Sequence, residues 1–160
     1  MAPALALAAE LAATPGADPA EHFTVSTAVQ GPGGVVLYLH HRAQAAWLLP
    51  GGHLDTADGS LLAAAERELA EETGIRTAVA VGELPLEFFR YVSRLTGSTA
   101  YHARFRHTVD PLPDCRLQES EVTAARWIPL AELTDRRLRE RLTGPGPDAA
   151  VGRGSASMSG

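Results

Sequence analysis

The sequence predicts a mixed α/β sandwich, and three observations support this fold class. The chain has 160 residues, 45% hydrophobic and 21% charged, which suits one domain with a substantial core. Apolar segments of strand length are joined by turns rich in Gly and Pro, which is typical of antiparallel hairpins. Helical segments lie between and after these strands, and strands flanked by helices favour a layered α/β arrangement.

The two ends of the chain differ from its middle. Residues 1–20 are rich in Ala and contain Pro15 and Pro19, so we expect an N-terminal extension there. Residues 144–160 begin Gly-Pro-Gly-Pro, end in Gly and Ser and lack apolar periodicity, so we expect a disordered C-terminal tail. The compact domain is therefore expected to span residues 21–143.

The first elements are expected to form a hairpin. Residues 23–29 and 35–40 have the apolar and β-branched composition of strands. The Gly-Pro-Gly-Gly segment at 31–34 is a turn that joins them. A short extended segment at 47–49 follows and ends at Pro50-Gly51-Gly52.

A helix is expected over residues 61–73. Ser60 is a favoured N-cap, and Gly74 stands where a left-handed C-cap is expected. Apolar residues that recur every four positions form its buried stripe: Leu61, Ala65 and Leu69.

The later elements are expected to be a second hairpin, a short strand and a closing helix. The expected strands are 79–81, 86–93, 100–109 and 126–128. Residues 95–99 form the turn of the second hairpin. The closing helix is expected over residues 134–142.

Charge and composition exclude several classes of protein. The net charge of −5 leaves no basic face, so a partner of polymeric nucleic acid is not expected. No apolar run reaches the roughly 20 residues of a membrane span, and no membrane partner is expected. A secretory signal is not expected either, because Glu10 interrupts the apolar N-terminus and no basic residue precedes it. The single cysteine, Cys115, is consistent with a cytoplasmic location.

Three glutamates in the second half of the expected helix are the most informative feature. Glu68 lies four residues before Glu72 and three before Glu71, so we expect all three carboxylates to crowd the side of the helix opposite Leu69. Repulsion between them destabilises a bare helix, and partial burial would raise their pKa values. A hard divalent cation such as Mg²⁺ or Mn²⁺ relieves both effects. A solvated acidic face remains the alternative for these residues taken alone.

The residues Gly52…Arg67-Glu68-Leu69-x-Glu71-Glu72-x-Gly74-Ile75 resemble the signature of the Nudix hydrolase family, of the MutT-like kind. The family pattern is Gly, five residues, Glu, seven residues, then Arg-Glu-aliphatic-x-Glu-Glu-x-Gly-aliphatic. Its second half is matched here at every defined position. The resemblance covers roughly residues 22–142 and implies a Nudix-type α/β/α sandwich with a mixed sheet.

The first half of the signature departs from the family pattern by one residue. Counting forward from Gly52, Asp58 stands where the first Glu belongs. Counting back from Arg67, that position is Gly59. The insertion falls in the loop 55–59, and the role of the first acid stays open between these two positions.

The resemblance implies a metal site. Glu68 and Glu72 are the expected direct ligands of Mg²⁺, for which Mn²⁺ is a substitute. Glu71 is expected to bind a second metal or to hold one through water, and the carbonyl of Gly51 is a further ligand candidate. Arg67 is expected to pair with an acidic neighbour and to orient the glutamates.

The activity implied is Mg²⁺-dependent cleavage of a phosphoanhydride bond in a nucleoside diphosphate linked to another group. Glu71 and Arg67 are expected to support this reaction. A base must activate the attacking water. By resemblance the base lies outside the signature, with Glu121 as first choice and Glu119 as second, although both also fit solvated loop acids. The expected partner is a small nucleoside diphosphate derivative, and a homodimer stays open because many relatives form dimers.

Several residues outside the signature are candidates for contacts with the substrate. Arg42 follows a strand and is expected to meet a phosphate. Other candidates lie on strands, where alternation sends about half of the residues away from any one face: Phe89, Tyr91, Tyr101, His102 and Arg104. The remaining strand and loop histidines are interpreted as surface or packing residues: His40, His41, His53 and His107.

Two other functions compete with the hydrolase. The first is a non-catalytic Nudix-like module that binds a nucleotide, but such modules usually lose part of the glutamate set, which is intact here. The second is isomerase chemistry, which in this fold uses a catalytic cysteine, and Cys115 is the only candidate.

Overall fold

The computed structural model describes residues 21–92 and 97–144 of the chain. In chain order the elements are β1 (Glu21–Gly31), β2 (Val35–His41), β3 (Ala46–Leu48), β4 (Gly51–His53), α2 (Leu61–Thr73), β5 (Val79–Ala80), β6 (Glu87–Val92), β7 (Thr99–Thr108), β8 (Val122–Pro129), a 3₁₀ turn (Leu130–Glu132) and α3 (Arg136–Thr143). The expected extension at 1–20, the tail beyond residue 144 and part of the expected 95–99 turn lie outside the described residues. No helix in the described ranges has the length and apolar character to cross a membrane.

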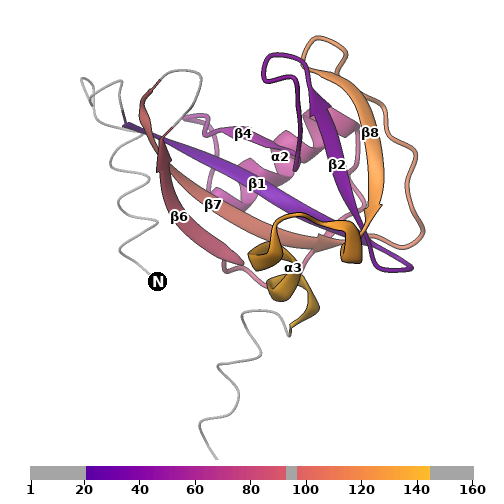
Figure 1. The fold of residues 1–160 in the computed structure, drawn as a ribbon. Coiled ribbons are helices and arrows are strands. Elements are labelled where there is room, and N and C mark those ends of the chain that lie inside the picture. The colour runs from indigo at the N-terminus through magenta and orange to yellow at the C-terminus, as the bar shows by residue number, and fades with distance from the viewer. Residues whose placement is uncertain (1–20, 93–96, 145–160) are drawn as a thin grey trace, which may run out of the picture.

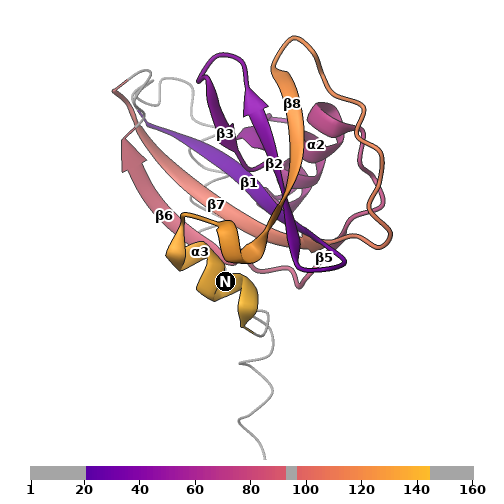
Figure 2. The ribbon, with the colours of Figure 1, turned by 45° about the vertical axis from the view of Figure 1, so that its right-hand side comes forward.

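Strand β1 lies at the centre of a mixed sheet. It pairs in parallel with β7 along its length and antiparallel with β2 and β4, and the other ladders are antiparallel. The ladder with β2 is confined to the turn end, at Gln30 and Gly31, while β4 pairs with the stretch from Thr24 to Ser26. The sheet therefore opens between β1 and β2, and β2, β3 and β8 curve away from β1, β7 and β6 (Figures 1 and 2).

The two described helices cover opposite faces of this sheet, as Figure 1 shows. Alternation along β1 turns Val25 and Val29 toward α2 and turns Ala28 toward α3. Leu138 and Leu142 of α3 complete the second core. The expected α/β/α sandwich with a mixed sheet is therefore confirmed.

Helix α2 has the ends and the buried stripe that its sequence predicts. The Ser60 hydroxyl accepts from the Ala63 N–H at 3.0 Å, and Gly74 adopts φ 72° and donates its N–H to the Ala70 carbonyl at 2.9 Å. The stripe residues are all buried: Leu61, Ala65 and Leu69. Both ends of the helix are therefore capped, and the caps define where its acidic last turn ends.

Several elements differ from the prediction. Gly51 and Gly52, expected in the loop that ends the extended segment at 47–49, form β4 with His53, because they pair with β1. β8 starts at Val122, four residues earlier than expected, because it pairs with β2 over most of that strand's length. α3 starts at Arg136, where Asp135 caps it by accepting from the Leu138 N–H at 2.9 Å. The 3₁₀ turn that precedes α3 has no periodic signal in the sequence.

Candidate functional site

The carboxylates gather where the last turn of α2 meets the opening between β1 and β2. Backbone hydrogen bonds hold the segment before β8 against this end of the helix, from Arg116 to the Thr73 carbonyl at 2.7 Å and from Gln118 to the Glu72 carbonyl at 3.0 Å. A turn from Gln118 then delivers Glu121 beside the helix. Four separate segments therefore meet at one place: α2, β4, the end of β2 and the loop before β8.

Glu72 is the buried centre of this arrangement, with 2% of its surface exposed. Its carboxylate accepts the Gly51 N–H at 2.9 Å. Burial raises the pKa of Glu72 to about 8, and the negative charges of Glu68 and Glu121 add to the effect. The expectation that Glu72 lies opposite Leu69 is wrong, because residues three apart share a helix face and Glu72 follows Leu69 into the protein.

His41 and Glu121 complete a group around Glu72. One ligand atom from each of these three side chains lies within 4.8 Å of the others. Glu121 is exposed, whereas His41 is partly buried. The sequence predicts a surface or packing role for His41, because the expected strand ends at His40 and the pairing of β2 with β8 has no sequence signal.

Glu68 faces β4 beside this group. Its carboxylate lies so close to Gly52 that a Cβ built there would stand 2.6 Å from the Glu68 Cδ atom. Burial raises the pKa of Glu68, and its bond to Arg67 partly offsets this. Gly51 is equally constrained, because a Cβ there would stand 2.1 Å from the Val25 carbonyl oxygen. The absence of side chains at both glycines lets the acidic turn of α2 lie against β4.

Arg67 ties the acidic residues of α2 to the loop before the helix. Its Nε and Nη2 donate to the two oxygens of Asp58 at 2.8 and 2.9 Å. Its Nη1 donates to Glu68 and to Glu71, both at 3.0 Å, and Nη2 also donates to the His53 carbonyl at 2.9 Å. Glu71 itself remains half-exposed. A forked guanidinium is needed for this set of bonds, since an ammonium presents no planar pair of donors.

The same contacts assign the acid of the extended loop. Asp58 is the residue that Arg67 grips, and this bond lowers the pKa of the Asp58 carboxyl. Its backbone N–H donates to the Asp55 carbonyl, and its carboxylate accepts the Asp55 N–H. Gly59 supplies no side chain, so of the two positions that the sequence left open, Asp58 provides the acid.

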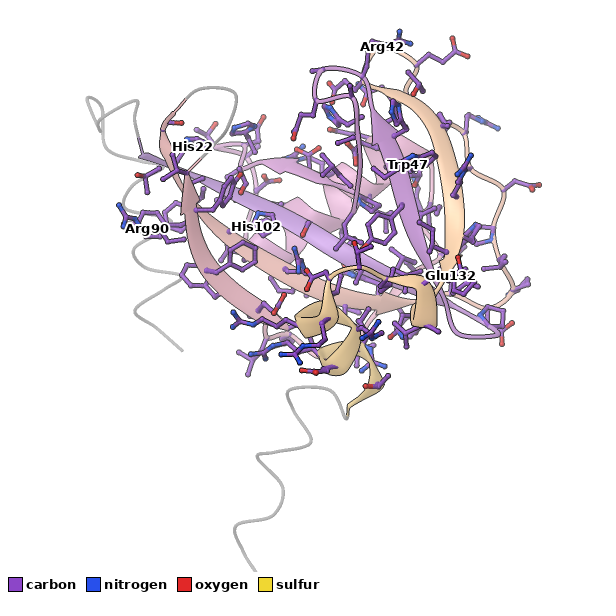
Figure 3. All side chains as sticks on the ribbon, in the orientation of Figure 1. His22, Arg42, Trp47, Arg90, His102 and Glu132 are labelled. Carbon is purple, nitrogen blue, oxygen red and sulfur yellow. The ribbon has the colours of Figure 1, made fainter. Side chains whose placement is uncertain are left out.

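Four of the expected substrate residues, Phe89, Tyr91, His102 and Arg104, form a separate cluster on the other face of the sheet. The rings of Tyr91 and His102 lie 6.0 Å apart, and Arg104 lies over Phe89 at 5.3 Å. Arg104 is held by Glu87 at 2.7 Å, which neutralises its charge. Figure 3 shows His102 over the sheet, well away from Arg42.

His102 is pinned at both ring nitrogens. Nδ1 lies 2.7 Å from Thr24 Oγ1, and Nε2 lies 2.7 Å from Ser26 Oγ. Burial lowers the pKa of His102 to about 4. The imidazole is therefore neutral at physiological pH, and the two hydroxyls fix the orientation of its ring in this cluster.

Arg42 lies beside the expected bases. Its Nη2 donates to the Glu119 carbonyl at 2.9 Å, and its backbone N–H donates to the Glu121 carbonyl at 2.7 Å. Arg42 therefore holds the loop that carries both acids. Glu121 belongs to the group around Glu72, and Glu119 does not.

Cys115 has surroundings unlike those of a reactive thiol. It packs against the apolar cluster around Leu69, and burial raises the pKa of its thiol. A catalytic cysteine needs a lowered pKa, so this environment gives no support to isomerase chemistry.

Comparisons with known proteins agree with this geometry. A family model described as the NUDIX domain matches residues 20–145. The phosphatase NudJ of Escherichia coli is 31% identical over 115 residues, which cover 70% of this chain and 71% of NudJ. MutT4 of Mycobacterium tuberculosis is 35% identical over 97 residues, which cover 59% of this chain and only 37% of MutT4.

The fold is also that of a solved relative. The crystal structure of an Ap4A hydrolase from C. elegans aligns with a TM-score of 0.63 over 76% of this chain and 95% of that chain, at 18% identity. This likeness concerns the fold, while the family model and NudJ concern the sequence. Together with the arrangement of Arg67, Glu68, Glu71 and Glu72 on α2, they show that the chain is a MutT-like hydrolase and belongs to the Nudix family.

Proposed function

We propose that this protein is a Mg²⁺-dependent hydrolase that cleaves a phosphoanhydride bond in a nucleoside diphosphate linked to another group. The observation that carries the proposal is the grouping of Glu72 and Glu121 within 4.8 Å of each other at the end of α2, with Glu68 packed against Gly52 of β4 beside them. Phosphoanhydrides are cleaved mainly by positioning and by neutralising charge on the phosphates, and a site of this kind supports both.

The donor set fits a hard divalent cation. Carboxylate oxygens are the ligands that Mg²⁺ prefers. Burial raises the pKa values of Glu68 and Glu72, and the negative charges of neighbouring glutamates add to the effect, so a bound cation would compensate these carboxylates. In this proposal Glu68, Glu72 and the Gly51 carbonyl hold the cation, and Glu71 holds a second one or its water. A bound cation would neutralise phosphate oxygens and stabilise the leaving group.

The protein's own groups have distinct parts in the reaction. Glu121 is exposed to solvent and is the proposed base that takes a proton from the attacking water. Arg67 keeps Glu68 and Glu71 oriented through its bonds to both. Arg42 is proposed to contact a phosphate of the substrate, and Tyr91, His102 and Arg104 are proposed to contact the part of the substrate that reaches their separate cluster. The name of the phosphatase NudJ is consistent with a phosphorylated substrate.

The test is phosphate or pyrophosphate release from nucleoside triphosphates, sugar nucleotides and dinucleotides, with Mg²⁺ and with EDTA. We expect turnover that requires the cation. Glu121→Gln should lower turnover roughly 10²–10⁴-fold, as expected for loss of a general base. Glu72→Gln should lower it at least about tenfold through loss of a ligand.

Glu140→Gln is the control, because Glu140 is an exposed acid on α3 and should be silent. Saturable nucleotide binding without turnover on any substrate would instead identify a binding module. Full activity in Glu121→Gln would remove Glu121 from the mechanism.

A further inference from the structure

We propose that His41 is a ligand of the divalent cation held by the glutamates, so that this site combines an imidazole nitrogen with carboxylate oxygens. The inference rests on the proposed function, since it concerns the same cation. It goes beyond the family signature, in which the ligands are glutamates and a backbone carbonyl.

The fold delivers the His41 side chain to the site from a different element. Leu37 and Leu39 of β2 face the core cluster that contains Leu69 of α2, and strand alternation puts His41 on that same face. The pairing of β2 with β8 shifts register between His40 and His41, so His41 lies opposite Val122, next to the base candidate Glu121.

One ring nitrogen of His41 has no partner in the described part of the chain, and two carboxylates lie nearby. Its Nδ1 atom is buried and has no hydrogen-bond partner among residues 21–92 and 97–144. Buried polar atoms normally have a hydrogen-bond partner or a ligand, so the unpaired Nδ1 atom of His41 calls for one. A ring nitrogen of His41, a carboxylate oxygen of buried Glu72 and one of Glu121 all lie within 4.8 Å of one another. A cation held by Glu72 would therefore lie within reach of the His41 ring, with the proposed base Glu121 beside it.

A nitrogen ligand changes which cation the site prefers. Carboxylates and water suit Mg²⁺, whereas imidazole suits later transition metals, and Co²⁺ binds such sites more tightly than Mn²⁺. The chain should therefore bind Co²⁺ much more tightly than an all-oxygen site would. Replacement of His41 by Gln exchanges nitrogen for an amide oxygen and should move the preference back toward Mg²⁺.

His40 provides a matched control on the neighbouring position. Its Nδ1 lies 2.6 Å from Thr123 Oγ1 in an exposed contact, and its ring lies 5.3 Å from that of Trp47. The ring is therefore engaged by other partners. His40→Gln tests the effect of losing a histidine from β2 without touching the cation site.

The experiment measures cation binding by the full chain without substrate. Calorimetric titration gives the affinities for Co²⁺ and Mg²⁺, and pulsed electron paramagnetic resonance of bound Mn²⁺ detects coupling to an imidazole nitrogen. We expect nitrogen coupling in the wild type and in His40→Gln, and none in His41→Gln. The Co²⁺ affinity of His41→Gln should fall at least about tenfold, since even partners outside the ligand set are worth roughly 10–100-fold, while Mg²⁺ affinity falls less.

Absence of nitrogen coupling in the wild type overturns the proposal, and this result does not depend on whether a variant folds. Coupling that persists in His41→Gln, or equal losses of Co²⁺ affinity in both variants, overturns it as well. Turnover with Mg²⁺ but no nitrogen coupling would leave the hydrolase standing without this ligand. Nitrogen coupling without turnover would support the ligand and remove the hydrolase.

Discussion

Arg67 is the residue on which the acidic turn of α2 depends. It contacts Asp58, Glu68, Glu71 and the His53 carbonyl, so one side chain joins the loop, the helix and the end of β4. The Arg67 side chain is about one quarter exposed, and the Asp58 side chain is 5% exposed. The pair with Asp58 is bidentate, which is the geometry in which Arg differs most from Lys.

Arg67→Lys should therefore preserve the positive charge but no longer hold the Glu68 and Glu71 carboxylates in their orientation. We expect turnover on the best substrate to fall roughly 10–100-fold, because Glu68 and Glu71 lose their fixed partner. Arg136→Lys is the control, since Arg136 is highly exposed on α3 and should leave turnover unchanged. Equal activity of the two variants, measured at saturating Mg²⁺, would show that the network around Arg67 does not orient the carboxylates.

At the scale of elements, the site depends on how closely α2 approaches β4. The close packing is confined to the contact with β4. A Cβ at Gly52 would clash with the Glu68 carboxylate, whereas a Cβ at Gly59 would meet nothing within 4 Å. Neither glycine has a left-handed φ, so the substitutions differ in space and not in backbone strain. The two positions thus separate the effect on the carboxylate from the effect of any Gly→Ala change.

Gly52→Ala should lower activity with little loss of stability. The atoms in the way belong to the end of a flexible side chain, so Glu68 moves aside and the backbone stays in place. We expect Mg²⁺ affinity and turnover to fall at least about tenfold. The unfolding midpoint should change little. Gly59→Ala should match the wild type in both measurements, and a comparable loss of turnover in that variant would contradict this account.

The elements show where sequence reasoning succeeds and where it stops. Helix α2 was predictable from end to end, because Ser60, Gly74 and the apolar stripe are local signals. The acidic signature was equally local. The position of His41 was not predictable, because it depends on the long-range pairing of β2 with β8. The burial of Glu72 was missed because the three glutamates were treated as one helix face.

At the scale of the molecule, buried polar groups join α3 to the sheet. Glu87 is buried and lies within ion-pair distance of Arg104 on β7 at 2.7 Å and of two arginines of α3, Arg137 at 3.0 Å and Arg141 at 3.2 Å. His102 lies two residues before Arg104 on β7, and its ring nitrogens contact the Thr24 and Ser26 hydroxyls of β1. Ion pairs and hydrogen bonds therefore join α3, β7 and β1 on this face of the sheet.

His102 makes the stability of the molecule depend on pH. Its folded-state pKa of about 4 lies below the ordinary value of about 6.5, so the unfolded chain binds more protons between these values. Stability from this group is complete above about pH 6.5 and is lost as the pH falls toward 4. The gap between the two pKa values corresponds to roughly 3 kcal/mol. Burial also lowers the pKa of His107, which adds in the same direction.

His102→Gln isolates this contribution, because an amide keeps polar contacts to Thr24 and Ser26 but does not titrate. The measurement is the free energy of unfolding by urea at pH 7 and at pH 4.5, for the wild type and the variant. We expect the wild type to lose roughly 2–3 kcal/mol more than the variant over this interval, since His107 and the carboxylates titrate in both. Parallel losses would mean that His102 titrates alike in the folded and unfolded chains, and the hydroxyl pair would then not hold a neutral ring.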